Sequence, residues 1–122
     1  ASRRSFLKRS SGAAFVTIVS PHVLGGPKHI APSDRIYVGV VGVGGRGREN
    51  VDDLLRQPDV IITAIADPSP LWNLDKYYYR GLAGRGPVGE RIEKHYQTTQ
   101  ANYRLNAYED FREMLAKQPE ID

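Results

Sequence analysis

The chain has 122 residues, enough for one domain and too few for two. Its positive charge is concentrated at the front: residues 1–30 contain five basic and no acidic side chains, whereas the rest contains 12 basic and 14 acidic ones. The body therefore lacks the basic surface that nucleic-acid binding requires, and we expect no nucleic-acid partner. Cysteine is absent, which excludes a disulfide framework, a thiolate metal site and a thiol nucleophile.

Residues 1–24 have the features of a twin-arginine export signal. Arg3 and Arg4 are followed by Ser-Phe-Leu-Lys, as in the twin-arginine consensus, and the apolar stretch 12–19 is too short to span a bilayer. This predicts the twin-arginine translocase as a partner and a periplasmic or other extracytoplasmic location. No Ala-x-Ala cleavage site follows, so the leader is either removed inefficiently or retained at the membrane as an anchor. The alternative is a basic tail that contains Arg-Arg by chance.

A linker is predicted over 25–33, which is rich in Gly and Pro, and a globular domain over 34–122. The domain begins with a β-branched apolar run, 36–41, typical of a parallel strand buried on both faces. An apolar stripe with i, i+3, i+4 spacing then predicts a helix over 48–57, and a second β-branched run predicts a strand over 60–66. Strand, helix and strand together form a βαβ unit with a right-handed crossover.

Beyond the second strand the pattern is weaker. A helix is predicted over 90–100, a short third strand over 103–107 and a last helix over 109–117. The last helix has three apolar residues on one face: Phe111, Met114 and Leu115. The C-terminal residues 121–122 are where a buried fourth strand is expected to begin.

An aromatic segment interrupts this pattern after the second strand. Residues 70–87 include Trp72 and the tyrosine run 77–79, and they have the character of an insertion. We expect these rings in the core or in an interface rather than stacked on a ligand. His95 is expected on the exposed side of its helix.

The motif that carries chemistry is the loop between the first strand and its helix, Gly42-Val43-Gly44-Gly45-Arg46-Gly47, a G-x-G-x-x-G sequence. Asp67 closes the second strand 20 residues after Gly47, and this context makes the motif a strong dinucleotide-binding signal. Gly42 allows a tight turn with positive φ, Gly44 leaves room for a pyrophosphate, and Gly47 lets the helix pack closely. The predicted cofactor-binding residues are Gly42, Val43, Gly44, Gly45, Arg46, Gly47 and Asp67.

The predicted cofactor is NAD, and NADP is the alternative. Asp67 would accept hydrogen bonds from the adenosine ribose and repel a 2′-phosphate, whereas Arg46 would help to hold one. Other interpretations stay open for each part of the motif. The glycines can form a turn without a ligand, and Asp67 can cap a turn before Pro68. Arg46 and Arg48 can be solvated surface side chains instead of phosphate ligands.

Five segments form a pattern that extends along the chain. They are Ser33-Asp34-Arg35-Ile36 leading into the glycine loop, Ala66-Asp67-Pro68, His95-Tyr96, the segment 107–115, and Ile121-Asp122. In this pattern the chain resembles the Gfo/Idh/MocA oxidoreductases, the group that contains glucose–fructose oxidoreductase and inositol dehydrogenase. The resemblance covers essentially the whole chain, leader included, apart from the insertion 70–87.

The resemblance implies an α/β fold with a Rossmann-type, doubly wound parallel sheet. Three strands are expected here, because the chain ends before the fourth. The resemblance also implies hydride transfer with NAD or NADP on a sugar, cyclitol or related carbohydrate. That substrate would bind through a missing C-terminal domain, and the full-length protein would be a homo-oligomer.

In the family, a catalytic lysine and a second-domain histidine follow the part that this chain matches. No residue here is therefore predicted to be catalytic or to ligate a metal, and the chain is expected to be a truncated gene product or part of a longer protein. Two other functions stay open. One is a non-catalytic Rossmann fragment, and the other is a nucleotide-binding or sensor module without redox activity.

Overall fold

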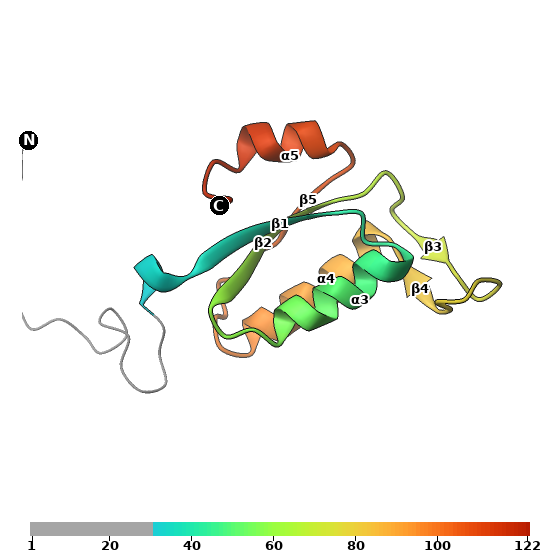
Figure 1. Cartoon of the computed structure of the whole chain (residues 1–122), viewed down its shortest axis with the longest axis horizontal. Coiled ribbons are helices and arrows are strands. Elements are labelled where there is room, and N and C mark those ends of the chain that lie inside the picture. The colour runs from blue at the N-terminus through green and yellow to red at the C-terminus, as the bar shows by residue number, and fades with distance from the viewer. Residues whose placement is uncertain (1–30) are drawn as a thin grey trace, which may run out of the picture. The chain divides into compact units, whose positions relative to one another are not determined.

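The computed structural model describes residues 31–122 (Figure 1). The predicted export leader 1–24 and the first part of the predicted linker, 25–30, lie outside the described residues. In the part that is described, no helix has the length and apolar character needed to cross a membrane. The elements in chain order are a 3-10 helix η1 (Pro32–Asp34), β1 (Ile36–Val41), α3 (Gly45–Leu55), β2 (Val60–Ala66), β3 (Trp72–Asn73), β4 (Leu82–Ala83), α4 (Arg85–Gln97), β5 (Asn106–Tyr108) and α5 (Phe111–Lys117).

The main sheet is parallel and has three strands in the order β1-β2-β5. Strands β1 and β2 pair along their whole length, from Ile36 opposite Val60 to Val41 opposite Ala66, with one register shift between Val38 and Gly39. Helices α3 and α4 cover one face of the sheet and α5 covers the other (Figure 1). The sheet is thus wound on both faces, and the predicted α/β architecture with three parallel strands is confirmed.

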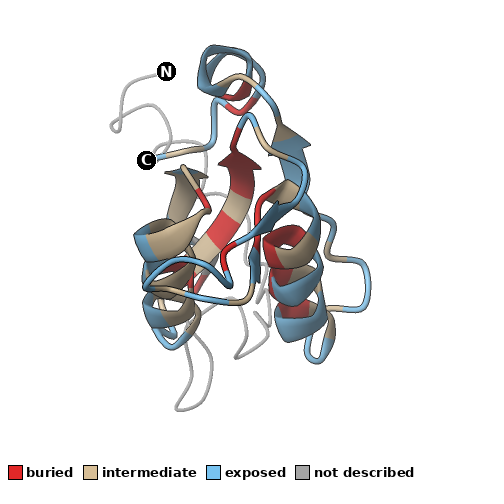
Figure 2. Ribbon diagram, turned by 90° about the vertical axis from the view of Figure 1, so that its right-hand side faces the viewer, coloured by how far each residue is buried: buried red, intermediate tan, exposed pale blue. Residues whose placement is uncertain are grey.

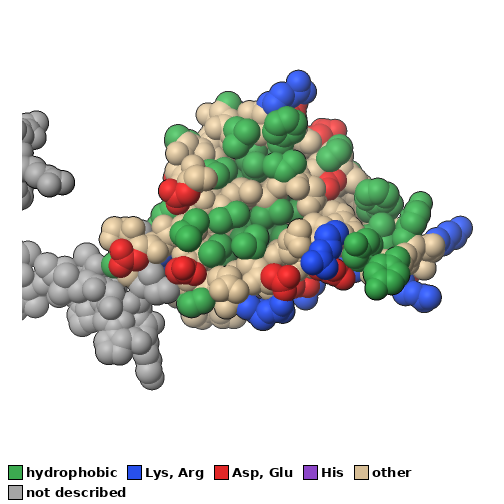
Figure 3. All heavy atoms as spheres, in the orientation of Figure 1, with side chains coloured by type: hydrophobic (Ala, Val, Ile, Leu, Met, Phe, Trp, Pro, Cys, Tyr) green, Lys and Arg blue, Asp and Glu red, His purple; other side chains and the backbone are tan. Residues whose placement is uncertain are grey.

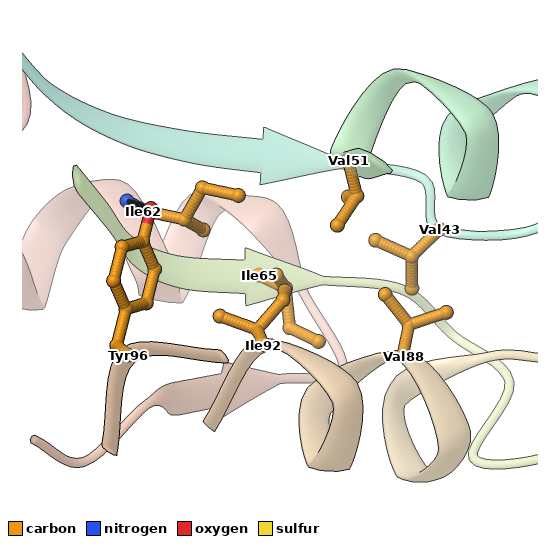
Figure 4. Close-up of a cluster of buried hydrophobic side chains, with 7 residues drawn as sticks. All are labelled: Val43, Val51, Ile62, Ile65, Val88, Ile92 and Tyr96. Carbon is orange, nitrogen blue, oxygen red and sulfur yellow. Dashed lines mark hydrogen bonds between the residues drawn. The ribbon is translucent and has the colours of Figure 1, made fainter. Parts of the chain in front are cut away.

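The core lies against the central strand, β2. Figure 2 shows the buried residues concentrated along this strand and on the helix faces that contact it, because β2 has a strand on each side and a helix on each face. The main cluster joins the glycine loop, α3, β2 and α4 (Figure 4): Val43, Val51, Ile62, Ile65, Val88, Ile92 and Tyr96. Each aliphatic side chain buried here contributes about 1.5–3 kcal/mol of hydrophobic stabilisation.

Two tyrosine hydroxyls complete the hydrogen bonding of β2. Strand β5 pairs only with Ala64 to Ala66, which leaves the first half of β2 without a strand on that side. The Tyr96 hydroxyl accepts from the Ile62 amide at 3.1 Å and donates to the Val60 carbonyl at 3.3 Å. The Tyr103 hydroxyl donates to the Ile62 carbonyl. Burial raises the pKa of both tyrosines, so both stay protonated donors at neutral pH.

Several predicted boundaries differ from the structure. Helix α3 begins at Gly45 rather than at Arg48, because the glycine loop leads directly into the first turn. Helix α4 begins at Arg85, well before the predicted 90, because Pro87 falls in its first turn, where no amide hydrogen bond is lost. The third strand is β5, which begins at Asn106 and not at 103.

Of the two positions expected for the aromatic rings of the insertion, the core is wrong, and an interface stays a prediction. The segment forms an antiparallel hairpin of β3 and β4, in which Trp72 is 47% and Tyr78 is 91% exposed. Figure 3 shows hydrophobic side chains gathered on this hairpin. The shared apolar face of the last helix is also only partly buried, since Met114 packs on β2 while Phe111 and Leu115 are exposed. His95 is exposed, as predicted.

The C-terminal residues lie beside β1, on the side away from β2. The Asp122 amide donates to the Tyr37 carbonyl at 2.9 Å, and the Asp122 carboxylate accepts from the Tyr37 amide at 2.8 Å. The Ile36 amide points the other way, to Asp59 beside β2. Successive residues of a strand direct their amides to opposite sides, so Tyr37 belongs to the outer edge of β1. Asp122 therefore pairs with β1 where the fourth strand is predicted to begin.

Candidate functional site

The glycine loop lies at the carboxyl end of β1 and has a backbone that only glycine allows at two positions. Gly42 has a φ of +82°, the positive value expected of a tight turn out of the strand. A Cβ added at Gly47 would lie 1.8 Å from the Gly42 carbonyl oxygen. The first turn of α3 therefore packs on the loop more closely than any side chain permits, as predicted for Gly47.

The first turn of α3 carries no acidic group of its own. Gly44 is the N-cap residue and supplies no side-chain cap, and no acidic residue lies in the first turn. The first hydrogen bond of the helix runs from the Arg48 amide to the Gly44 carbonyl at 3.1 Å, so the amides of Gly45, Arg46 and Gly47 have no partner within the helix. Together with the helix dipole, such amides attract an anion.

Asp67 ties the end of β2 to the glycine loop. One carboxylate oxygen accepts from the Val43 amide at 2.9 Å and the other accepts from the Ser69 amide at 2.8 Å. The residue is 7% exposed. Asp67 thus caps the turn that follows β2, which is one of the interpretations left open above. Its bond to Val43 also holds the glycine loop against the end of β2, and the sequence pattern does not predict this bond.

The β3–β4 hairpin lies over the glycine loop. A Cβ added at Gly44 would lie 3.3 Å from Cε3 of Trp72, and one added at Gly45 would lie 2.9 Å from Cδ2 of Tyr79. The space at Gly44 that is predicted to receive a pyrophosphate therefore holds an indole edge in this structure. Tyr77 packs edge-on against Trp72, with ring centroids 6.4 Å apart, and so extends the aromatic cover outward.

The two arginines of the loop region have different roles. Arg46 pairs with Glu49 at 2.7 Å on the surface, where both side chains are exposed, so its interpretation as a surface residue fits this structure. Arg48 binds the hairpin: its guanidinium donates to the Tyr79 carbonyl at 2.7 Å and to the Leu82 carbonyl at 3.0 Å. This contact was missed by sequence reasoning. Its only signal is a cation in the first turns of a helix, where the dipole disfavours it.

A second arginine missed by sequence reasoning holds the base of the hairpin. Arg85, the first residue of α4, donates from its guanidinium to the Asp67 carbonyl and from its amide to the Ser69 carbonyl. The adjacent Gly84 has a φ of +98°, and its amide donates to the Val43 carbonyl at 3.3 Å. Loop, hairpin and α4 therefore meet at the carboxyl end of the sheet.

An open cleft of about 600 Å³ lies beside the glycine loop, between the sheet and the start of α5. Its walls are Val41, Gly42, Ala66, Pro68 and residues 109–113. In open α/β sheets, ligands bind at the carboxyl ends of the strands, which is where this cleft is found. On its α5 side, hydrogen bonds from Arg112 hold the pKa of Asp110 below its usual range, so Asp110 and Arg112 face the cleft as an ion pair.

Within residues 31–122, no group of three or more His, Asp or Glu side chains is arranged to hold a metal ion. The predicted site residues nevertheless come together: Gly42, Val43, Gly44, Gly45, Arg46, Gly47 and Asp67 all lie at one end of the sheet. No protein-family model, no curated protein and no solved structure matches this chain.

Proposed function

We propose that the chain binds a dinucleotide, NAD(H) in the first place, with the diphosphate on the glycine loop. The observation that carries the proposal is the junction of β1 and α3. It combines a positive φ at Gly42, a contact at Gly47 that excludes any side chain, and a helix whose first amides have no cap. In this proposal the three-stranded sheet is the first part of a Rossmann-type domain.

The chemistry of the junction suits a diphosphate better than a neutral ligand. Phosphate oxygens are acceptors only, and the first turn of α3 presents amide donors with the positive end of the helix dipole behind them. No carboxylate in that turn opposes an anion. Arg48 lies one residue beyond the loop and supplies a cation near the same place.

The choice between NAD and NADP depends on Asp67. Its two oxygens already accept hydrogen bonds from the Val43 and Ser69 amides, so the carboxylate already stabilises the conformation of the loop. A carboxylate has room for about four hydrogen bonds, and Asp67 keeps capacity for a ribose hydroxyl. Its charge at the end of β2 also disfavours a 2′-phosphate. We therefore propose NAD, and NADP is the alternative to test.

The wider function rests on the resemblance described above. We propose that this dinucleotide-binding unit belongs to an exported oxidoreductase that transfers a hydride to or from a carbohydrate, and that residues 1–24 direct it to the twin-arginine translocase. No residue of the chain is assigned a catalytic role in this proposal. Substrate and oligomer contacts are assigned to other parts of such an enzyme.

A second candidate is a glycine turn without a ligand, in a protein without redox activity. The observation that favours it is the cover of aromatic rings: Trp72 lies on Gly44 and Tyr79 lies on Gly45. For this candidate, the rings of Trp72 and Tyr79 permanently fill the space that a diphosphate would need. The two candidates differ in one measurable property, which is the affinity of the loop for a diphosphate.

The test is calorimetric titration of the 122-residue chain with NADH, ADP and adenosine. The proposal expects NADH and ADP to bind and adenosine to bind far more weakly, because the loop recognises the diphosphate. Gly44→Val should remove binding and still allow folding, since the nearest neighbour of the new side chain is the half-exposed ring of Trp72. Gly89→Ala is the matched control, because a Cβ there makes only ordinary contact, 3.4 Å from Leu105.

The outcomes separate the two candidates. Loss of NADH and ADP binding in Gly44→Val, with normal binding in Gly89→Ala, supports the phosphate site. A folded parent chain that binds neither NADH nor ADP supports the glycine turn without a ligand. Equal affinities for ADP and adenosine would mean that the loop does not recognise phosphate.

A further inference from the structure

The β3–β4 hairpin and a diphosphate would need the same space on the glycine loop. We infer that residues 71–83 form a displaceable cover, which shields the loop in the unliganded chain and moves aside when a diphosphate binds. The inference rests on the proposed function and adds that the hairpin controls the access of a diphosphate to the glycine loop. It concerns the insertion that lies outside the glycine motif.

Contact distances show why ring and ligand exclude each other. A phosphate oxygen must come to about 2.9 Å from an amide nitrogen to accept its hydrogen bond. The indole edge of Trp72 already lies 3.3 Å from the Cβ position of Gly44, and the ring of Tyr79 lies 2.9 Å from that of Gly45. The rings thus occupy the space beside Gly44 and Gly45, where a diphosphate on the loop would have to lie.

The hairpin is hydrogen-bonded within itself and can move as one body. The Leu74 amide donates to the Gly81 carbonyl at 2.7 Å, and the Gly81 amide donates to the Asp75 carboxylate at 2.9 Å. The Tyr77 amide donates to the Leu74 carbonyl at 2.8 Å. These bonds connect the two legs of the hairpin and its tip, so they survive a rotation of the whole segment.

The base of the hairpin is fixed separately and marks where the movement would occur. The Arg85 amide donates to the Ser69 carbonyl at 3.0 Å, and the Gly86 amide donates to the Pro70 carbonyl at 2.8 Å. Both bonds lie outside residues 71–83. Gly84 joins the hairpin to α4 with a φ of +98°, a backbone conformation that a non-glycine residue rarely adopts, and it belongs to the fixed base. Trp72 and Leu82 are about half exposed in the closed position, whereas Leu74 and Ala83 are buried, so ligand binding has to offset the exposure of some apolar surface on opening.

Arg48 connects the cover to the ligand. In the closed position its guanidinium donates to the carbonyls of Tyr79 and Leu82. Moving the hairpin frees this guanidinium beside the amides that would hold the diphosphate. Hydrogen bonds between an arginine and a phosphate are stronger than those to a neutral carbonyl. An anion is therefore the ligand that shifts Arg48 from the hairpin to the loop, and a neutral nucleoside is not.

Trp72 is the only tryptophan of the chain, so its fluorescence reports the cover directly. The experiment titrates the 122-residue chain with ADP and excites Trp72 at the long-wavelength edge of its absorption, where adenine does not absorb. It follows Trp72 emission and its quenching by acrylamide. The inference expects saturable emission changes and stronger quenching when ADP binds. Adenosine should leave both unchanged.

Variants of the hairpin test the competition. Because the closed state lowers the apparent affinity by the fraction of open molecules, Trp72→Ala should bind ADP several-fold more tightly than the parent. Tyr79→Ala should change the affinity in the same direction. Leu71→Ala is the control, since this apolar side chain of the same hairpin is 59% exposed, and it should bind like the parent. Calorimetry provides the affinities, and thermal melts show that each variant is folded.

The possible failures are distinguishable. If the parent binds ADP while Trp72 emission stays constant, or if Trp72→Ala binds ADP more weakly, the rings are ligand contacts or bystanders and the cover is refuted, whereas the proposed function stands. If neither parent nor Trp72→Ala binds ADP or NADH, the proposed function fails and the cover fails with it.

Discussion

The Asp67 carboxylate accepts a hydrogen bond from the Val43 amide at 2.9 Å, across 24 residues of sequence, in a buried position. This bond joins the end of the central strand to the middle of the glycine loop. Asp67 is itself held by the neighbouring strand β5, because its amide donates to the Tyr108 carbonyl at 3.0 Å. The side chain of Asp67 therefore holds the loop to the end of β2 together with a backbone bond, in which the Gly42 amide donates to the Ala66 carbonyl at 2.8 Å.

The first prediction concerns this bond. Asp67→Asn should lower the free energy of unfolding by about 1–3 kcal/mol, because an asparagine has one acceptor oxygen for the two amides that the carboxylate serves. Denaturant unfolding of both chains measures the difference. Asp53→Asn is the control, since Asp53 forms only an exposed pair with Arg56 and should change stability little. Equal losses in the two variants would contradict the role of Asp67.

Cofactor preference provides the second prediction. Asp67→Ser should shift the ratio of NADH to NADPH affinity toward NADPH by about tenfold, because a repulsion of roughly 1 kcal/mol or more between two charges about 4 Å apart is removed. Titrations of parent and variant with both cofactors, below the melting temperature of the variant, measure the ratio. A parent that binds both cofactors equally would speak against this role.

The third prediction compares two glycines. Gly47→Ala should destabilise the domain by roughly 4 kcal/mol or more, since its Cβ would lie 1.8 Å from the Gly42 carbonyl oxygen and the helix would have to move away from the loop. Gly89→Ala should be neutral or stabilising by about 0.5–1 kcal/mol, because Gly89 is within α4 and its Cβ has room. Urea midpoints of the two variants test this contrast. Similar midpoints would show that the close approach at Gly47 is not needed.

The fourth prediction concerns Tyr96 and alkaline pH. Tyr96→Phe should cost about 1–3 kcal/mol, because the Ile62 amide and the Val60 carbonyl lose their partner in a buried place. Tyr78→Phe, on the exposed hairpin, should cost nothing measurable.

The pH dependence follows from the same tyrosines. Burial raises the pKa of Tyr96 and Tyr103 in the folded chain, so the folded state holds its protons to higher pH than the unfolded state does. Their contribution to stability is therefore complete below about pH 10, the pKa of a free tyrosine, and declines above it. Urea midpoints between pH 8 and pH 11 measure the decline, which should be smaller in Tyr96→Phe. A midpoint that rises with pH above 10 would refute the assignment.

The fifth prediction addresses the leader. Replacing Arg3 and Arg4 together by Lys should keep a reporter fused after Ser33 in the cytoplasm, because the twin-arginine translocase requires the arginine pair. Fractionation of cells that carry the parent and variant fusions measures the change. Export of the double variant at the parent level would show that Arg-Arg is incidental here.

The two long strands were predictable from the sequence, whereas the cover of the loop was not. Continuous β-branched runs bounded by Gly42 and by Asp67-Pro68 determine β1 and β2 locally, so their predicted bounds agree with the structure. The contact of Trp72 with Gly44 joins segments that carry no shared pattern, and it depends on how the hairpin folds back. Exposed aromatic rings also depart from the general tendency to bury them, which is why the core, one of the two positions expected for this segment, is wrong.

The candidate site also has some features that the sequence predicts and others that it does not. The glycine loop and Asp67 could be predicted as a candidate site because their spacing has a physical meaning that is independent of the rest of the chain. The roles of Arg48 and Arg85 depend on backbone carbonyls, which every residue has, so no residue type marks their partners. Side chains that bind carbonyls far along the chain leave little trace in the sequence.

The hydroxyls of Tyr96 and Tyr103 also have a consequence for behaviour at high concentration. An exposed strand edge with free amides and carbonyls invites a strand from another molecule, which is how β-rich aggregates begin. Beside Val60 and Ile62 such pairing is blocked, because the tyrosine hydroxyls already form hydrogen bonds with the carbonyls and the amide that an incoming strand would need. Strand β5 can thus have only three residues without exposing an edge of β2 that could pair with a strand of another molecule.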